Sequence, residues 1–174
     1  MKVIQCGEKY GTLDNKNFTV SIRGKTFHFN RNLIIDSGDV LKINNEIWQV
    51  MDFNPSLFPL ISDRKAQIIQ AYDAAYIIAK SGIHAGNSVV ESGVGSGALT
   101  AHILWAIGDS GTLTSIDFDA ERIEVAKSGL GRFFNLKNWH TVNDRMENDH
   151  GIRGADACIL DVPNPWDSLP VAKT

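Results

Sequence analysis

The sequence predicts an α/β protein in which a small all-β region precedes a doubly wound parallel sheet. Three observations lead to this fold class. Residues 1–53 alternate apolar and polar side chains with the period of two that is typical of half-buried strands. From residue 64 onward, short apolar strands alternate with segments of helical periodicity. A glycine-rich turn, Ser92-Gly93-Val94-Gly95-Ser96-Gly97, joins one of these strands to the helix that follows.

Two hairpins are expected in the N-terminal region. The first turns at Gly24, and the second turns at Asn44-Asn45, a pair suited to left-handed backbone. The expected strands span residues 18–23, 25–29, 40–43 and 47–50. Short strands joined by tight turns favour a small barrel or sandwich.

The two regions are expected to be separate domains. Residues 54–63, with Pro55 and Pro59, have the composition of a linker. We therefore expect a small β-domain with its linker over residues 1–63 and a second domain over residues 64–174. The second domain is expected to contain, in order, a helix from about residue 64 to Gly82, strand 88–92, helix 97–107, strand 112–117, helix 119–129, strand 138–142 and strand 156–161.

The last of these strands predicts that the chain is a fragment of a longer protein. Its residues Ala157-Cys158-Ile159-Leu160 are apolar on both faces, as in a central strand of a parallel sheet. At the end of an incomplete sheet of about four strands, it would leave an apolar unpaired edge.

Composition excludes several classes of protein. Residues 1–63 carry seven basic and seven acidic side chains, and residues 64–174 carry ten and thirteen, so neither part has the basic balance of a dedicated nucleic-acid binder. Two distant cysteines and five histidines show no metal-ligand spacing, so no metal is expected. Without a signal peptide or a long apolar run, the chain is expected to be soluble, cytoplasmic and not membrane-bound.

The glycine-rich turn is the most informative motif. Gly93, Gly95 and Gly97 allow a ligand to approach the backbone closely, and the next helix presents free N–H groups at its start. The same turn also fits the dinucleotide pattern Gly93-x-Gly95-x-x-Ala98, with Asp117 as the ribose acid. The glycines alone therefore leave S-adenosylmethionine (SAM) and NAD both open.

Glu91 favours SAM over NAD. It precedes the first glycine by two residues, at the carboxyl end of the strand, where ligands bind. A carboxylate there repels the diphosphate of NAD, whereas it attracts the ammonium group and the cationic sulfur of SAM.

Acidic residues also follow the next two strands. Asp117 is expected to bind the two hydroxyls of a ribose; the alternative is a helix N-cap, a role expected instead for Asp119. Asp144 is expected to accept a hydrogen bond from the exocyclic amine of adenine, or else is an ordinary loop acid. The pair Arg64-Lys65 either meets phosphate or begins a solvated helix.

The run Asp161-Val162-Pro163-Asn164-Pro165-Trp166 follows the fourth strand. It places a carboxylate, an amide and an aromatic ring at the crevice where open α/β sheets bind ligands. The alternative is a turn with a packed tryptophan.

These motifs resemble those of the tRNA (adenine-N1)-methyltransferase family, which methylates N1 of an adenine in the tRNA T-loop. The resemblance covers most of residues 60–170. The family's Ala-Gln-Ile-Ile run is matched at residues 66–69, its glycine motif at residues 91–100, and its Leu-Asp-Leu-Pro-Asp-Pro-Trp run at residues 160–166. The chain departs from the family at Gln70 and Ala71, which replace Tyr-Pro, and at Asn164, which replaces an acid.

The resemblance implies a Rossmann-like SAM-dependent methyltransferase fold, SAM as the cofactor, tRNA as the partner and a homotetramer. It implies Asp161 as the catalytic acid. The implied cofactor-binding residues are Gln67, Glu91, Gly93, Gly95, Ser96, Gly97, Leu99, Thr100, Asp117, Phe118, Asp144 and Asp161. The implied substrate-binding residues are Arg64, Lys65, Asn164, Pro165 and Trp166.

Three other functions compete with this one. Asn164-Pro165-Trp166 is similar to the Asn-Pro-Pro-Tyr type motif of enzymes that methylate an exocyclic amine. A non-catalytic tRNA-binding subunit is a second alternative, disfavoured by the intact glycine loop and Asp161. A dehydrogenase is the third, disfavoured by Glu91.

Overall fold

The computed structural model describes residues 1–30, 33–62 and 67–173, and these form two compact units. The first unit spans Met1–Ser62 and the second Asp63–Thr174. Each is described by itself below. In the described ranges, no helix is long and apolar enough to cross a membrane.

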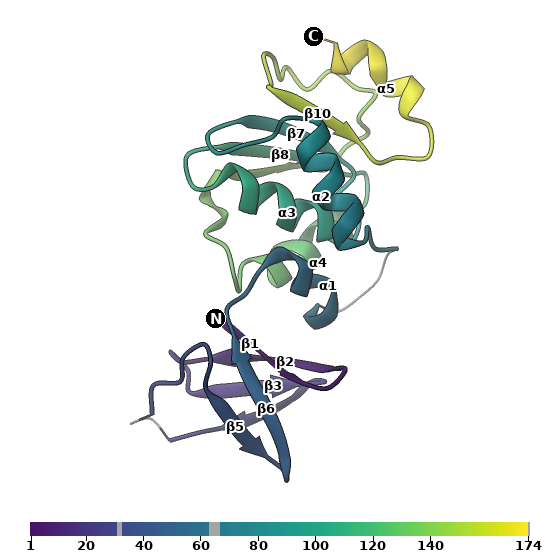
Figure 1. Ribbon diagram of the computed structural model, residues 1–174. Helices are drawn as coiled ribbons and strands as arrows, with labels where there is room; N and C mark the ends of the chain where they lie inside the picture. Colours follow the sequence, from purple (N-terminus) through teal and green to yellow (C-terminus); the bar gives the residue numbers. More distant parts are fainter. Residues whose placement is uncertain (31–32, 63–66, 174) are drawn as a thin grey trace. The chain divides into compact units, whose positions relative to one another are not determined.

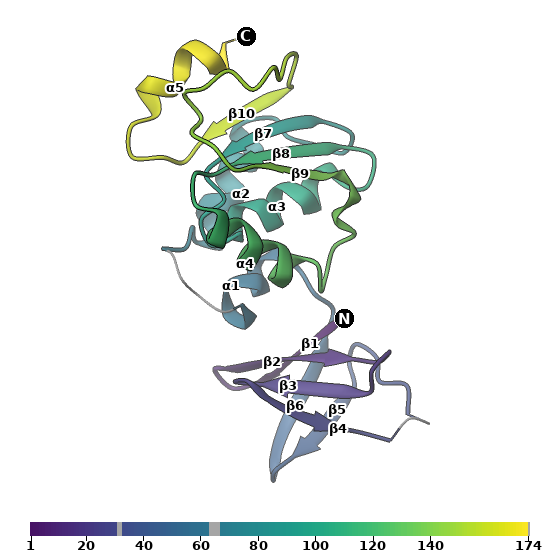
Figure 2. The same cartoon turned by 180° about the vertical axis from the view of Figure 1, so that it is seen from behind.

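The first unit contains a six-stranded antiparallel sheet in the order β4-β3-β2-β1-β6-β5 (Figure 1; β4 is labelled in Figure 2). Its strands are β1 (Lys2–Cys6), β2 (Lys9–Asp14), β3 (Thr19–Ile22), β4 (Lys25–His28), β5 (Val40–Ile43) and β6 (Glu46–Met51). Both expected hairpins are confirmed, because β3 pairs with β4 and β5 pairs with β6. Asn44 and Asn45 have φ values of 49° and 63°, as a left-handed hairpin turn requires.

One face of this sheet covers an apolar core. Ile4, Leu13, Val20, Trp48 and Val50 come from five positions on four strands and form one buried cluster. Ile35, from the segment between β4 and β5, completes this cluster and is 1% exposed. The segment that carries Ile35 is therefore part of the core.

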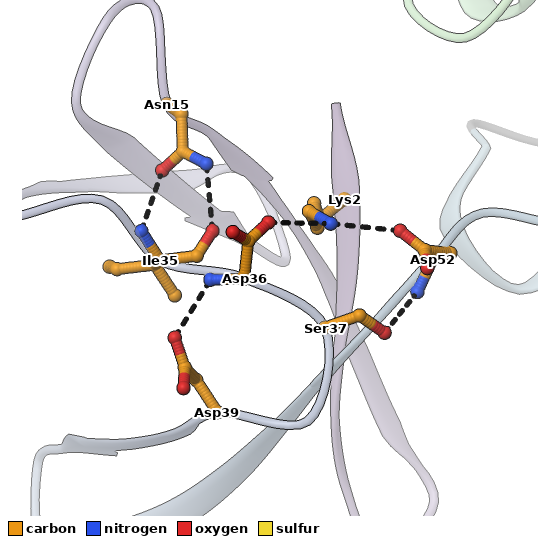
Figure 3. Close-up of polar contacts among 7 residues, drawn as sticks. All are labelled: Lys2, Asn15, Ile35, Asp36, Ser37, Asp39 and Asp52. Carbon is orange, nitrogen blue, oxygen red and sulfur yellow. Dashed lines mark hydrogen bonds and ion pairs between the residues drawn. The ribbon is translucent and has the colours of Figure 1, made fainter.

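Polar contacts hold the segment of Ile35 against the sheet (Figure 3). The Asn15 side chain bonds both backbone groups of Ile35, accepting from its N–H at 3.4 Å and donating to its carbonyl at 2.7 Å. Lys2 Nζ lies 3.0 Å from a carboxylate oxygen of Asp36 and 2.9 Å from one of Asp52. It therefore joins β1 to the residue after Ile35 and to the residue after β6. The side chain of Asn15 thus satisfies the backbone groups of Ile35, which lies outside the strands.

The expected linker over residues 54–63 instead contains two short helices where it is described. A 3₁₀-helix spans Pro55–Leu57, and α1 spans Phe58–Ile61. Asn54 caps the first by accepting a hydrogen bond from Ser56 N at 3.1 Å, and Pro55 supplies the fixed φ of a first helical position. Because Phe58 and Pro59 are buried, the segment packs as structure rather than as a spacer.

The second unit is a four-stranded parallel sheet in the order β10-β7-β8-β9 (Figure 2). Its strands are β7 (Ser88–Ser92), β8 (Thr112–Ile116), β9 (Trp139–Val142) and β10 (Ala157–Leu160), and its helices are α2 (Ala71–Lys80), α3 (Ala98–Ile107), α4 (Ala120–Leu130) and α5 (Pro165–Ala172), with a 3₁₀-turn at Leu136–Asn138. The expected doubly wound fold after a small β-domain is confirmed. Among the described residues, β10 pairs with β7 alone and lies at the edge of the sheet.

Helices α2 and α3 lie on one face of this sheet in both views (Figures 1 and 2). Eight of the ten residues of α3 are buried, so this helix belongs to the core of the unit. On the sheet, Leu113 and Ile116 are fully buried.

The first helix of the second unit begins later than its periodicity predicts. Ile68 and Ile69 lie in non-helical backbone, and α2 starts at Ala71 after an extended Gln70 with φ −70° and ψ 153°. Consecutive β-branched isoleucines weaken helix propensity at this point. Arg64 and Lys65, the predicted phosphate contacts, lie outside the described residues.

Candidate active site

A cavity of about 250 Å³ opens at the carboxyl edge of the parallel sheet. The ends of all four strands line it, because parallel strands bring their carboxyl ends to one edge. Its walls include Ser92, Gly93 and Gly95 after β7, Asp117 and Phe118 after β8, Asp144, Arg145 and Met146 after β9, and Asp161 and Asn164 after β10. Four segments that are far apart in the sequence therefore meet at one site.

The glycine-rich turn needs its glycines for two different reasons. Gly95 and Gly97 have φ values of 54° and 78°, a conformation that side chains with a Cβ rarely adopt. At Gly93, a Cβ would lie 3.0 Å from Oδ2 of Asp117. The absence of a side chain at Gly93 thus lets the Asp117 carboxylate reach the turn.

Asp117 is fixed at the centre of the site by backbone donors. Its Oδ2 accepts a hydrogen bond from Gly95 N at 3.2 Å, and its Oδ1 accepts one from Asp119 N at 2.9 Å. The expected cap at Asp119 is confirmed, because Asp119 Oδ1 accepts from Glu121 N and Arg122 N at the start of α4. Asp117 therefore lines the cavity with its carboxylate held in place, while Asp119, two residues later, caps the helix.

Phe118 and two arginines form the outer wall of the cavity. The Phe118 ring is 64% exposed, and the guanidinium carbons of Arg122 and Arg145 lie 5.8 and 5.7 Å from its centre. Such distances are typical of cation–π contacts. All three residues line the cavity, and the two arginines were not expected from the sequence.

Asp144 lines the cavity, and its carboxylate is held by hydrogen bonds. Its Oδ1 accepts hydrogen bonds from Asn148 Nδ2 and Arg145 N, both at 2.8 Å. The bond from Asn148, more than any other contact, lowers the pKa of Asp144 below its usual value. His150 Nε2 lies 3.4 Å from the other oxygen of this carboxylate.

Glu91 lies beneath the glycine-rich turn rather than on the cavity wall. It is fully buried, and its carboxylate accepts hydrogen bonds from Thr100 Oγ1 at 2.8 and 3.1 Å and from Ser115 Oγ at 2.7 Å. Trp139 Nε1 in turn donates to Ser115 Oγ at 2.8 Å. The network ties the end of β7 to α3, β8 and β9, and it therefore supports the turn from below.

Burial raises the pKa of Glu91 to about 7, against the hydrogen bonds from Ser115 and Thr100, which lower it. The nearby carboxylates Asp161 and Asp117 raise this pKa further. A cation in the cavity would favour the ionised form of Glu91, whereas an anion would oppose it.

The pKa of Glu91 predicts that Glu91→Gln changes how stability depends on pH. The folded state holds a proton on Glu91 up to about pH 7, whereas the unfolded state loses it near 4.5, so wild-type stability falls as pH rises between these values. Between pH 5 and 8 this linkage amounts to about 2–3 kcal/mol.

Urea unfolding at pH 5 and pH 8 measures this effect. The free energy of unfolding of Glu91→Gln, taken relative to that of wild type, should increase as pH rises. Glu124→Gln, at an exposed position of α4, should show the same pH dependence of stability as wild type. Parallel curves for wild type and Glu91→Gln would contradict the raised pKa.

The remaining predicted residues occupy different places. Asp161 is exposed in the cavity wall, and its N–H donates to the carbonyl of Ser92. Asn164 lines the cavity, whereas Pro165 and the 74% exposed Trp166 do not. Gln67, Ser96, Gly97, Leu99 and Thr100 also lie outside the cavity wall. Leu99 and Thr100 are buried in α3, so both face the protein interior.

The arrangement suits a small ligand that carries hydroxyls, an amine or a positive charge. Three carboxylates, from Asp117, Asp144 and Asp161, face one cavity and accept hydrogen bonds. In the described part of the chain, no group of His, Cys, Asp and Glu side chains has the geometry of a metal site. Sequence reasoning missed five residues that also line the cavity, namely Arg122, Arg145, Met146, Glu147 and Ser168.

Comparisons with known proteins identify relatives of this chain. The family model of the tRNA methyltransferase complex GCD14 subunit matches residues 47–174. The tRNA (adenine(58)-N(1))-methyltransferase catalytic subunit TRM61 of Cryptococcus neoformans is 27% identical over 175 residues, covering 94% of this chain and 40% of that protein. The tRNA (adenine(57)-N(1)/adenine(58)-N(1))-methyltransferase TrmI of Methanocaldococcus jannaschii is 28% identical over 146 residues, covering 68% of this chain and 52% of that protein. The chain thus spans about half the length of these relatives or less.

Solved structures share the fold. TrmI of Aquifex aeolicus, a tRNA (m1A58) methyltransferase, superposes with a TM-score of 0.74 at 26% identity, over 98% of this chain and 68% of that one. A SAM-dependent O-methyltransferase of Thermotoga maritima gives a TM-score of 0.77 at 18% identity, over 98% and 65% of the two chains. The second likeness concerns the fold alone.

Proposed function

Because the chain belongs to the family of the tRNA methyltransferase complex GCD14 subunit, we propose that it binds SAM and directs methyl transfer to N1 of an adenine in the tRNA T-loop. One observation carries the proposal. The cavity brings the glycine-rich turn together with three carboxylates that come from three different strand ends. The TRM61 relative is named for this reaction at adenine 58, and the TrmI relative is named for it at adenines 57 and 58.

The residues in the cavity fit SAM. Gly93 and Gly95 leave room for the methionine end against the backbone, and Asp117 can accept both ribose hydroxyls. Asp144 can accept from the exocyclic amine of the adenine ring beside Phe118. The ammonium group of SAM would favour the ionised form of Glu91 below the turn, whereas the diphosphate of NAD would oppose it.

In this proposal the protein works mainly by positioning. SAM supplies an electrophilic methyl group on a cationic sulfur. Adenine N1 has an in-plane lone pair, so no base must first remove a proton. Asp161, at the exposed side of the cavity, accepts a hydrogen bond from the amino group of the target base and balances the charge that develops on its ring. Since N1 is masked in a paired base, the target must be unpaired or flipped.

Further parts of the proposal concern the whole protein. We propose that it acts in the cytoplasm as a homotetramer, with tRNA contacting more than one subunit. Asn164 lines the cavity beside Asp161, and this favours methylation of an exocyclic amine as the second candidate. Nucleoside analysis of methylated tRNA separates the two products.

Calorimetric titration with SAM, with NAD as the control, tests the cofactor. We expect SAM to bind and NAD not to bind. Binding of NAD alone would favour a dehydrogenase. If the folded chain bound neither, the role of a non-catalytic tRNA-binding subunit would become the better explanation.

A further inference from the structure

Ser168, on α5, is a buried polar residue beside the cavity, and its hydroxyl has no partner among the described residues. Its side chain is 1% exposed, and its hydroxyl makes no hydrogen bond to any described residue, including the carbonyls of its own helix. Ser168 nevertheless lines the cavity. A buried hydroxyl without a partner is costly, and in folded proteins such groups are satisfied by a ligand or an ordered water molecule.

The packing of α5 locates Ser168 beside the cavity. Ser168 and Ala172 are four residues apart and so share one face of the helix. Ala172 packs against a buried cluster that contains Ile116 and Met146. Both of these residues also line the cavity. Ser168 therefore lies toward the part of the cavity that is formed by the end of β8 and the segment after β9.

This part of the cavity also holds Asp144, two residues before Met146. Under the proposed function, Asp144 binds the exocyclic amine of the SAM adenine, so the adenine ring lies in this part of the cavity. Adenine offers ring nitrogens as acceptors, and the hydroxyl of serine can donate to them.

We propose that the Ser168 hydroxyl hydrogen-bonds the adenine ring of SAM, as a ligand-binding residue supplied by α5. The assignment rests on the proposed function. The acidic residues of the site accept hydrogen bonds, whereas the Ser168 hydroxyl would donate one, and it would contact the adenine ring rather than the ribose. It also explains why α5 has a polar side chain at a buried position that lines the cavity.

Ser168→Ala tests the proposal through two opposite effects. Loss of one neutral hydrogen bond should weaken SAM binding by about 3- to 10-fold in calorimetry. Without ligand, the variant should melt at the wild-type temperature or higher, because alanine leaves no unpaired hydroxyl and is the better helix former. Ser128→Ala, the same change at an exposed position of α4, is the matched control and should leave SAM affinity unchanged.

The outcomes separate the proposal from its premise. If wild type does not bind SAM, the proposed function fails, and this assignment fails with it. If wild type binds SAM and Ser168→Ala binds it equally well, only the assignment is overturned, and a water molecule satisfies the hydroxyl. A variant that melts lower than wild type without ligand, with unchanged affinity, would show a structural role only.

A second measurement on the wild-type chain decides the question if Ser168→Ala does not fold. S-adenosylhomocysteine is compared with analogues in which one adenine ring nitrogen is replaced by C–H. One analogue should bind wild type about 3- to 10-fold more weakly than the parent compound. In Ser168→Ala, where it folds, that difference should disappear. Equal binding of all the analogues to wild type would overturn the assignment.

Discussion

Replacing Asp117 by alanine is expected to reduce SAM affinity by at least about 100-fold, because charge-assisted hydrogen bonds contribute about 1.5–3 kcal/mol each and the carboxylate can accept two from the ribose. The structure adds a second reason. Asp117 accepts hydrogen bonds from Gly95 N and Asp119 N, so its loss also releases the glycine-rich turn. The binding site and the turn therefore depend on one side chain.

Two further variants separate these contributions. Asp117→Asn keeps one carbonyl acceptor, so its SAM affinity in calorimetric titration should lie between those of wild type and Asp117→Ala. Asp119→Ala removes the cap of α4, and should cost about 1 kcal/mol of stability while SAM affinity stays near that of wild type. Equal SAM affinities for wild type and Asp117→Ala would show that Asp117 does not bind SAM and serves only to hold the turn.

Much of the candidate site could be predicted because its signals are local. Asp117, Asp144 and Asp161 each follow a recognisable strand directly, and parallel strands bring such residues to one edge without any knowledge of side-chain packing. The Asn44-Asn45 hairpin was predictable for the same reason, since two adjacent residues determine its turn.

The rest depends on register and packing between distant segments. Glu91 meets Ser115 because β7 and β8 pair these two residues, and Trp139 is placed by the pairing of β8 with β9. No spacing in the sequence reveals these partners. Local propensity also failed where packing decides, since residues 54–63 have linker composition and yet bury Phe58. Ser168 carried no signal in the sequence, because its importance arises from its burial against the cavity.

Replacement of Asp161 should affect SAM binding and methyl transfer very differently. Asp161→Ala is expected to retain SAM binding within a few-fold and to slow methyl transfer by about 100- to 1,000-fold, the size of effect typical of losing one electrostatic contact to a transition state. Its carboxylate is exposed in the cavity wall, whereas Asp117 is buried and bonded to the turn, so Asp161 can face the incoming base. Transfer is measured with SAM and unmodified tRNA, followed by nucleoside analysis for N1-methyladenosine.

The control for Asp161→Ala is Asp167→Ala, an exposed acid in the first turn of α5 that does not line the cavity. It removes the same charge nearby and should leave both binding and transfer unchanged. If Asp161→Ala lost SAM binding and methyl transfer in equal measure, the carboxylate would hold the cofactor rather than act on the base. If wild type bound SAM and transferred no methyl group to tRNA, this chain would bind the cofactor but would not catalyse transfer by itself. A catalytic role for Asp161 would then require residues from elsewhere.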